Sequence, residues 1–147
     1  MLISVLGLSQ NQSPDRKADE AAIRELIARP QQQIKRTDDS IFWSGAFPRP
    51  QVGSQRIEPF PSVQAQKRKN ETVTVHPERI ELAGSGDMAY EFSYANLEYN
   101  VEAPAPQHIA FQSGLLRVWK KVHGEWRVAA MFIRPLDVPF SNPAPSR

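Results

Sequence analysis

The sequence predicts an α+β domain in which a short helical segment is followed by an antiparallel sheet. Residues 18–29 (ADEAAIRELIAR) place apolar side chains at helical spacing. Residues 72–133 contain four runs rich in β-branched and aromatic residues, most of them joined by short turn sequences. Such runs are typical of an antiparallel meander. With 147 residues, the chain has the size of one domain with a substantial core.

Composition excludes several classes of function. The net charge of +2 is too small to indicate nucleic-acid binding, and Lys67-Arg68-Lys69 lacks interleaved aromatic residues, so we interpret it as a solvated helix end. The chain has no cysteine, which excludes disulfides and thiolate catalysis. His76, His108 and His123 are scattered without metal-ligand spacing, so we expect neither a metal site nor a cofactor.

The ends of the chain are expected to lie outside the domain, which we place at residues 18–135. Residues 1–17 are predicted to be an arm. Its apolar run Leu2–Leu8 and the triplet Gly7-Leu8-Ser9 resemble the end of a secretory signal without the basic region, which leaves cytoplasmic and exported locations open. Residues 136–147 read as a proline-rich tail. No segment is long enough to span a membrane.

The helix at 18–29 is supported at both ends. Acidic residues in its first turn suit the helix dipole, and Pro30 ends it. The following residues 31–36 add at most one turn, with Ile34 pointing inward. The apolar face of the helix consists of Ala22, Ile23, Leu26 and Ile27.

The first β-rich run, residues 40–47, ends in a turn that contains Gly53. Residues 54–70 are ambiguous, because their composition favours a helix after Pro61 while two prolines interrupt its start. The remaining strands are predicted at 72–82, 88–100, 108–122 and 125–133.

His123-Gly124 is predicted to form a two-residue hairpin turn, since glycine accepts the positive φ that such turns need. Trp119 then lies opposite Val128, and Lys121 opposite Trp126. One face of the hairpin is expected to carry Leu115, Arg117, Trp119, Trp126, Val128, Ala130 and Phe132, and the other Leu116, Val118, Arg127, Ala129, Met131 and Ile133. Both faces are largely apolar, which predicts helices on one and a second subunit, in a homodimer, on the other.

Four segments carry a resemblance to a known superfamily. "AIRELI", "DDSIFWSG", "GSGDMAYEF" and above all "SGLLRVWKKVHGEWRVA" resemble the SnoaL-like and DUF4440 group of the NTF2-like superfamily. The resemblance covers residues 18–135. It implies the cone of the ketosteroid isomerase-like fold, a curved antiparallel sheet wrapped around N-terminal helices. This sequence departs from the pattern at Pro30, so the usual second helix is expected to be reduced or missing.

The resemblance does not bring a catalytic set with it. The position of the isomerase base falls on Ser44, and a serine without a neighbouring base cannot abstract a carbon-bound proton at neutral pH. Residues 40–57 and 103–124 contain no Asp or Glu, and the first helix contains no tyrosine. We therefore assign no catalytic residue, because fold alone does not establish activity.

A ligand site is nevertheless predicted. Tyr90, Phe92, Tyr94 and Asn96 alternate onto one face of their strand, which in the resemblance lines the cavity of the cone. We expect the same cavity to be lined by Phe42, Ser44 and Gln112, with His108 at its rim. Such a lining suits a small, mostly apolar, uncharged molecule, or alternatively these side chains simply fill the core. Trp43 is expected on the opposite face from Phe42.

Two other functions stay open at this stage. The first is a dehydratase, cyclase or isomerase that uses Tyr94, His108 or Asp38 in an unfamiliar arrangement. Asp38-Asp39 more simply forms a turn before the first strand. The second is an assembly module that dimerises through its sheet without a ligand. No nucleic acid or membrane is expected as a partner.

Overall fold

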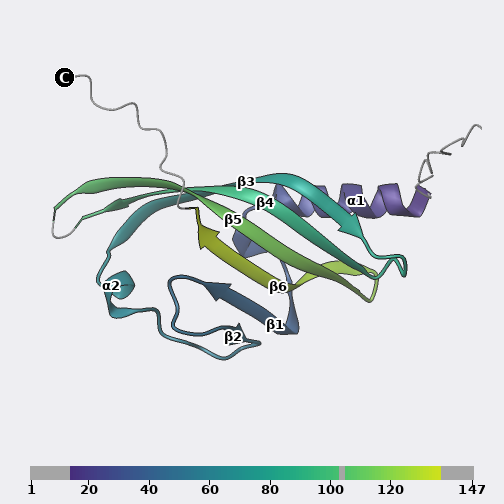
Figure 1. Cartoon of the computed structure of the whole chain (residues 1–147), viewed down its shortest axis with the longest axis horizontal. Coiled ribbons are helices and arrows are strands. Elements are labelled where there is room, and N and C mark those ends of the chain that lie inside the picture. Colours follow the sequence, from purple (N-terminus) through teal and green to yellow (C-terminus); the bar gives the residue numbers. More distant parts are fainter. Residues whose placement is uncertain (1–13, 103–104, 137–147) are drawn as a thin grey trace, which may run out of the picture.

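The computed structural model describes residues 14–102 and 105–136. In chain order its elements are α1 (Pro14–Ile27), a 3₁₀ turn η1 (Gln31–Gln33), β1 (Arg36–Ser44), β2 (Gln51–Val52), α2 (Pro61–Gln64), β3 (Arg68–Leu82), β4 (Met88–Val101), β5 (Gln107–Val122) and β6 (Glu125–Pro135). The strands form one sheet in the order β2-β1-β6-β5-β4-β3, in which only the β1–β6 pair is parallel (Figure 1). The α+β class with a curved sheet is confirmed.

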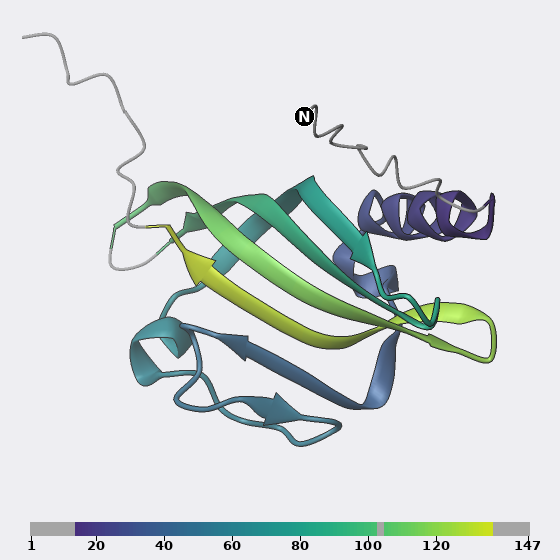
Figure 2. The same ribbon diagram turned by 45° about the vertical axis from the view of Figure 1, so that its right-hand side comes forward.

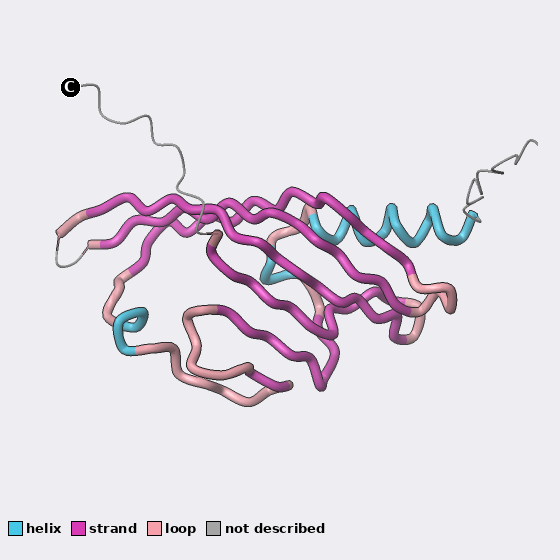
Figure 3. The backbone as a smooth tube through the Cα atoms, viewed as in Figure 1, coloured by secondary structure: helices cyan, strands magenta, loops and turns pink. Residues whose placement is uncertain are grey.

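Helices form a small part of the described chain, as Figure 3 shows. α1 lies at the end of the sheet where β3 finishes, whereas α2 lies toward the opposite edge, near β1 and β2 (Figure 2). No helix among the described residues has the length and apolarity needed to cross a membrane. The signal-like segment Leu2–Leu8 and residues 137–147 of the tail lie outside the described residues.

The helical predictions are correct in kind and wrong in extent. α1 begins at Pro14, four residues before the predicted start, and thus includes the end of the predicted arm. After Pro30 only the 3₁₀ turn η1 follows, as expected from the departure at that proline, and Ile34 packs against the core. The helix expected after Pro61 lasts four residues, because β3 begins at Arg68. Lys67-Arg68-Lys69 therefore leads into a strand and is not a helix end.

The predicted hairpin turn is confirmed. His123 and Gly124 have φ values of 51° and 80°, the left-handed conformation that a tight two-residue hairpin requires. Trp119 lies opposite Val128 and Lys121 opposite Trp126, as expected.

Beyond that point the expected faces of β6 are wrong. The register shifts between Val118 and Trp119, whose partners are Ala130 and Val128, so Ala129 is an extra residue. A bulge of this kind reverses the side on which every later side chain lies. Met131 and Ile133 consequently share a face with Arg117 and Leu115, and Ala130 and Phe132 lie on the other face.

The hydrophobic core lies between α1 and one face of the sheet, which we call the α1 face. Ile23 and Ile27 of α1 are buried against sheet residues Ala89, Trp119, Trp126 and Val128. Small and large side chains are matched, since Ala89 lies opposite Trp119 across the β4–β5 pair. Burial of one large aliphatic or aromatic side chain stabilises a fold by about 1.5–3 kcal/mol. These contacts therefore determine which face the helix covers.

Polar contacts also hold α1 in place. Asp19 accepts hydrogen bonds from the Lys121 ammonium at 2.6 Å and from the Trp126 indole N–H at 3.0 Å. Arg16 donates to the carbonyl of Leu82 at 2.9 Å. The N-terminal half of the helix is thereby tied to both the β5–β6 hairpin and the end of β3.

The other side of the sheet, which we call the open face, presents large apolar side chains to solvent. Eight of them are between 38 and 45% exposed, of which Met88 lies at the start of β4 and the other seven lie together. These seven follow the strand registers in two rows across β1, β6, β5 and β4, one of which extends to Val52 of β2. The seven are Ile41, Trp43, Val52, Tyr90, Phe92, Leu116 and Phe132.

Candidate functional site

The residues predicted to line one cavity lie on two opposite faces of the sheet. Phe42 pairs with Met131, which packs against the core, so Phe42 and Ser44 belong to the α1 face. Tyr90, Phe92, Tyr94 and Asn96 instead lie on the open face, together with Gln112, the partner of Asn96, and His108, the partner of Asn100. These residues therefore do not all line the single cavity that the sequence had suggested. The expectation that Trp43 lies opposite Phe42 is confirmed.

The two alternating sets of side chains on β4 are buried the other way round from the prediction. Of the two alternating sets on this strand, the small and polar one (Ala89, Glu91, Ser93, Ala95) is buried. The aromatic set faces outward, because Trp119 of the neighbouring strand and the apolar side of α1 already occupy the space above Ala89.

The open face has a polar half beyond Tyr94. Asn96 accepts a hydrogen bond from the amide of Gln112 at 3.2 Å, and its own amide nitrogen lies 3.4 Å from Nε2 of His76. Nδ1 of His108 lies 2.9 Å from Oδ1 of Asn100. These side chains satisfy one another in cross-strand pairs.

The three residues considered for an enzymatic function do not lie together at one site. Tyr94 pairs with Gly114 and His108 with Asn100, so six residues of β4, roughly 20 Å, separate the two levels. Asp38 is exposed within β1, two strands away from β5. The turn expected at Asp38-Asp39 is also wrong, because both residues lie inside β1, where the pairing with β6 is irregular.

An apolar pocket of ≈ 670 Å³ lies on the open face, where β1 and β6 end. Five of its lining residues are aromatic, and two of the predicted residues, Ser44 and Phe92, take part in it. Its volume lies within the range of small-molecule sites. The side chains that define it are Trp43, Phe47, Phe60, Phe92, Leu116 and Phe132.

Gly114 makes room for this pocket. It occupies an open-face position of β5 between Tyr94 and Arg134, where any side chain would project over the pocket. A Cβ built there meets only the end of the Leu136 side chain, at 3.4 Å. Trp43 and Phe132 form one wall, with ring centroids 6.4 Å apart in an edge-to-face arrangement. The pocket is thus a hollow within the exposed apolar rows.

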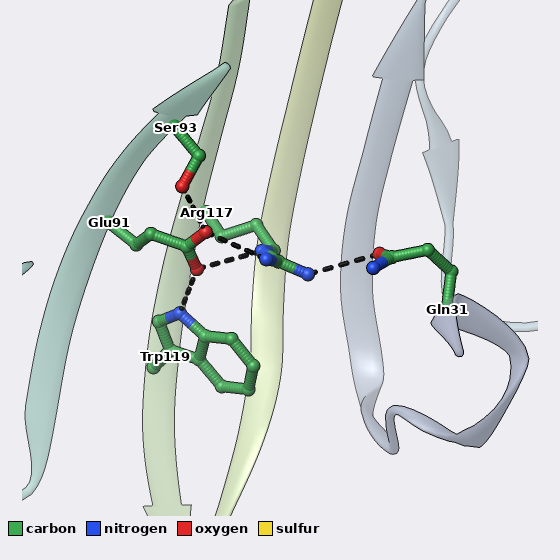
Figure 4. A network of polar contacts seen from close by, with 5 residues as sticks. All are labelled: Gln31, Glu91, Ser93, Arg117 and Trp119. Carbon is green, nitrogen blue, oxygen red and sulfur yellow. Dashed lines mark hydrogen bonds and ion pairs between the residues drawn. The ribbon is translucent and has the colours of Figure 1, made fainter. Parts of the chain in front are cut away.

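A second notable cluster lies on the α1 face and was missed from the sequence. Glu91 is fully buried and accepts two hydrogen bonds from Arg117, Nε to Oε2 at 2.8 Å and Nη2 to Oε1 at 2.7 Å. The indole N–H of Trp119 donates to Oε2 at 2.8 Å, and the Ser93 hydroxyl donates to Oε1 at 2.5 Å. Arg117 also donates to the side-chain oxygen of Gln31 at 3.1 Å (Figure 4).

This arrangement is that of a structural ion pair. Each carboxylate oxygen of Glu91 already accepts two hydrogen bonds, so neither has a free position toward a substrate. A general base must reach the proton that it removes, and Glu91 has no exposed surface. A buried acid is therefore present outside the two ranges considered from the sequence, but its geometry does not restore the isomerase chemistry.

One sequence signal did point to this cluster. The confirmed hairpin turn places Arg117 and Trp119 on the same face as Trp126, and the β4–β5 register puts Glu91 directly opposite Arg117. Opposite charges at one cross-strand position on a core face indicate a buried pair. The β4–β5 register was not worked out from the sequence, so the pair was not found.

Comparisons with known proteins identify the fold and nothing finer. No protein-family model matches the sequence, and neither does any curated protein. An NTF2-like superfamily protein from Salmonella enterica is 18% identical with a TM-score of 0.57, over 87% of this chain and 95% of that one. A ketosteroid isomerase-like protein from Erwinia carotovora is 16% identical with a TM-score of 0.52, over 83% and 91%.

A third solved structure, described as a putative calcium/calmodulin dependent protein kinase II association domain from Xanthomonas campestris, is 13% identical with a TM-score of 0.51. It matches over 83% of each chain. At such identities a likeness establishes the fold alone. The NTF2-like, ketosteroid isomerase-like fold expected from the sequence is thereby confirmed.

Proposed function

We propose, from the NTF2-like fold and the pocket beside Gly114, that this protein binds a small, mostly apolar, uncharged molecule on the open face of its sheet. The observation that carries the proposal is the pocket itself. Six large apolar side chains surround ≈ 670 Å³, and the polar groups among its lining residues are few. Sites of this kind obtain affinity from apolar contact and orientation from a few polar atoms.

Catalysis has less support. The buried carboxylate of Glu91 is fully hydrogen-bonded, and Tyr94, His108 and Asp38 lie at separate places on the sheet. The proposed role is therefore binding without a recognisable catalytic set. Membership of the SnoaL-like or DUF4440 group remains part of the proposal, supported by the sequence segments that resemble that group.

A titration with the uncharged fluorophore N-phenyl-1-naphthylamine tests the binding proposal. The probe should become brighter on the purified protein, and native mass spectrometry should show one probe per pocket. Gly114→Leu should weaken probe binding at least tenfold, because the new side chain projects into the pocket. The matched control is Ala110→Leu, which adds the same side chain at an exposed open-face position of β5 outside the pocket. Equal binding by both variants, or none by the wild type, would overturn the proposal.

Self-association through the open face is the second candidate, and a separate observation favours it. Seven side chains of roughly 200 Å² each, about 40% exposed, present roughly 550 Å² of apolar surface on a single face. A standard interface buries about 800 Å² per partner, of which somewhat more than half is apolar. The similarity to a putative association domain supports the same reading.

A charge-insertion pair tests this second candidate. Ile41→Glu/Tyr90→Glu places two carboxylates in the patch but outside the pocket, and should convert a dimer to a monomer in sedimentation velocity. The control Val73→Glu changes an equally exposed apolar residue of β3 that faces the other side of the sheet. A wild-type monomer at 100 µM, or dissociation by the control alone, would contradict self-association through this face.

A further inference from the structure

The pocket and the exposed apolar rows share side chains. Trp43, Phe92, Leu116 and Phe132 line the pocket, and the same four form one of the two rows across β1, β4, β5 and β6. A molecule in the pocket and a protein surface on the open face must therefore touch the same residues. The two binding events cannot be independent of one another.

We propose that the occupant of the open face is a second copy of this chain, and that this copy and the pocket ligand bind cooperatively, the ligand filling a hollow that the two subunits enclose. This inference rests on the proposed ligand site and adds the partner that completes it. A symmetric contact of two identical patches is the natural arrangement, since such a patch needs only to be complementary to itself.

The composition of the face supports a second copy. The two rows contain no charged side chain, and two of the charged residues next to them are paired with each other. Arg79 and Glu81, beside Phe92 and Tyr90, form an ion pair at 2.9 Å. A patch whose central rows carry no charge suits another apolar face better than a charged partner. Its apolar area matches what one subunit contributes to a standard dimer.

The shape of the open face determines whether the ligand and the second subunit strengthen or weaken each other's binding. A partner laid across the rows closes over the pocket, because Gly114 leaves the floor low between neighbouring side chains. Side chains that line an empty hollow inside an interface lack van der Waals contacts on one side. An apolar molecule that fills the hollow restores those contacts. The ligand should therefore tighten the dimer, and by reciprocity the dimer should tighten the ligand by the same factor.

The test combines the dimer dissociation constant, from sedimentation velocity over a concentration series, with titrations of N-phenyl-1-naphthylamine. In the wild type, saturating probe should lower the dimer dissociation constant about tenfold, and probe affinity should rise in parallel as protein concentration increases. Ile41→Glu/Tyr90→Glu should stay monomeric and bind the probe with the weak affinity of the monomer. Gly114→Leu should dimerise with a dissociation constant that no longer responds to the probe.

The outcomes separate the two proposals. Absence of probe binding at every protein concentration overturns both the ligand site and the coupling. Probe binding with an unchanged dimer dissociation constant overturns the coupling and leaves the ligand site standing. Dissociation of the dimer by the probe also overturns the coupling, because ligand and partner would then compete for the same side chains. Far-UV circular dichroism and melting temperature confirm that each variant is folded.

Discussion

Replacing Glu91 by glutamine should strongly destabilise this protein without changing the shape of its core. The substitution keeps the volume and one acceptor oxygen of the side chain but removes its charge. Arg117, which is 1% exposed, is then left with its guanidinium buried and without a counter-charge. The remaining acceptors are neutral, namely the amide oxygen of the new glutamine and that of Gln31, which lies at 3.1 Å.

The magnitude follows from this geometry. Removing one partner of a buried ion pair costs about 3–5 kcal/mol, because the other charge stays desolvated. A domain of this size has a total free energy of unfolding of about 5–15 kcal/mol, so the variant should lose a large fraction of it. At about 2–4 °C per kcal/mol, the melting temperature should fall by roughly 10 °C.

The assay is urea denaturation followed by tryptophan fluorescence and far-UV circular dichroism, with linear extrapolation. Glu98→Gln is the matched control, since Glu98 lies on the same strand with its side chain 57% exposed. It should change stability by less than about 0.5 kcal/mol. Glu91→Gln combined with Arg117→Met removes both charges and keeps an acceptor for the Trp119 indole, so the double variant should cost less than the sum of the two single ones. Additive effects, or a Glu91→Gln variant as stable as the control, would refute the reasoning.

Three smaller predictions concern the surface of the fold. His123→Asn should raise the free energy of unfolding by up to about 1 kcal/mol in urea denaturation, because asparagine tolerates the φ of 51° better than histidine; a loss of stability would contradict the turn assignment. Asp19→Ala should cost about 1–2 kcal/mol through the lost contact with Lys121, and hydrogen exchange should quicken in α1 more than in β4. A hydrogen bond from Arg127 lowers the pKa of Glu125 below its ordinary value of 4.5. The ionised Glu125 side chain therefore stabilises the fold fully above pH 4.5, and this stabilisation is lost as the pH falls through the lowered pKa. Wild type and Glu125→Gln should therefore differ slightly in melting temperature at neutral pH and converge in acid.

Local signals in the sequence predicted the elements better than their orientation. The hairpin at His123-Gly124 follows from the φ preference of glycine and from two flanking β-rich runs, both of which lie within a few residues. The end of the first helix before Pro30 has an equally local cause. The bulge at Ala129 has no such signature, since Val-Ala-Ala-Met reads as ordinary strand. One extra residue there was enough to move Met131 and Phe132 to the opposite faces.

The candidate site was predicted only in part for a related reason. β4 has one aromatic and one small-polar set of side chains, and alternation alone cannot say which of them is covered. The choice is made by residues distant in sequence, namely Ile23 and Ile27 of α1 and Trp119 of β5. Phe92 and Ser44, two of the predicted residues, are among the lining residues of the pocket, whereas Phe47, Phe60 and Gly114 were not predicted, because their contributions depend on loop positions and on an absent side chain.

The buried ion pair explains how a sheet with two apolar faces keeps a single arrangement. Slipping β4 against β5 by one residue would move Glu91 to the open face and leave Arg117 buried without a counter-charge, which the bidentate contact at 2.7 and 2.8 Å prevents. Apolar packing alone would discriminate weakly, because Phe92 and Leu116 are about as hydrophobic as the residues beneath α1. We infer that the ion pair fixes the register of β4 and β5 more than it raises the free energy of unfolding, because the cost of desolvating the two charges offsets much of their attraction. By fixing which side chains face α1, it also fixes the aromatic rows and the hollow at Gly114, on which ligand and partner binding both depend.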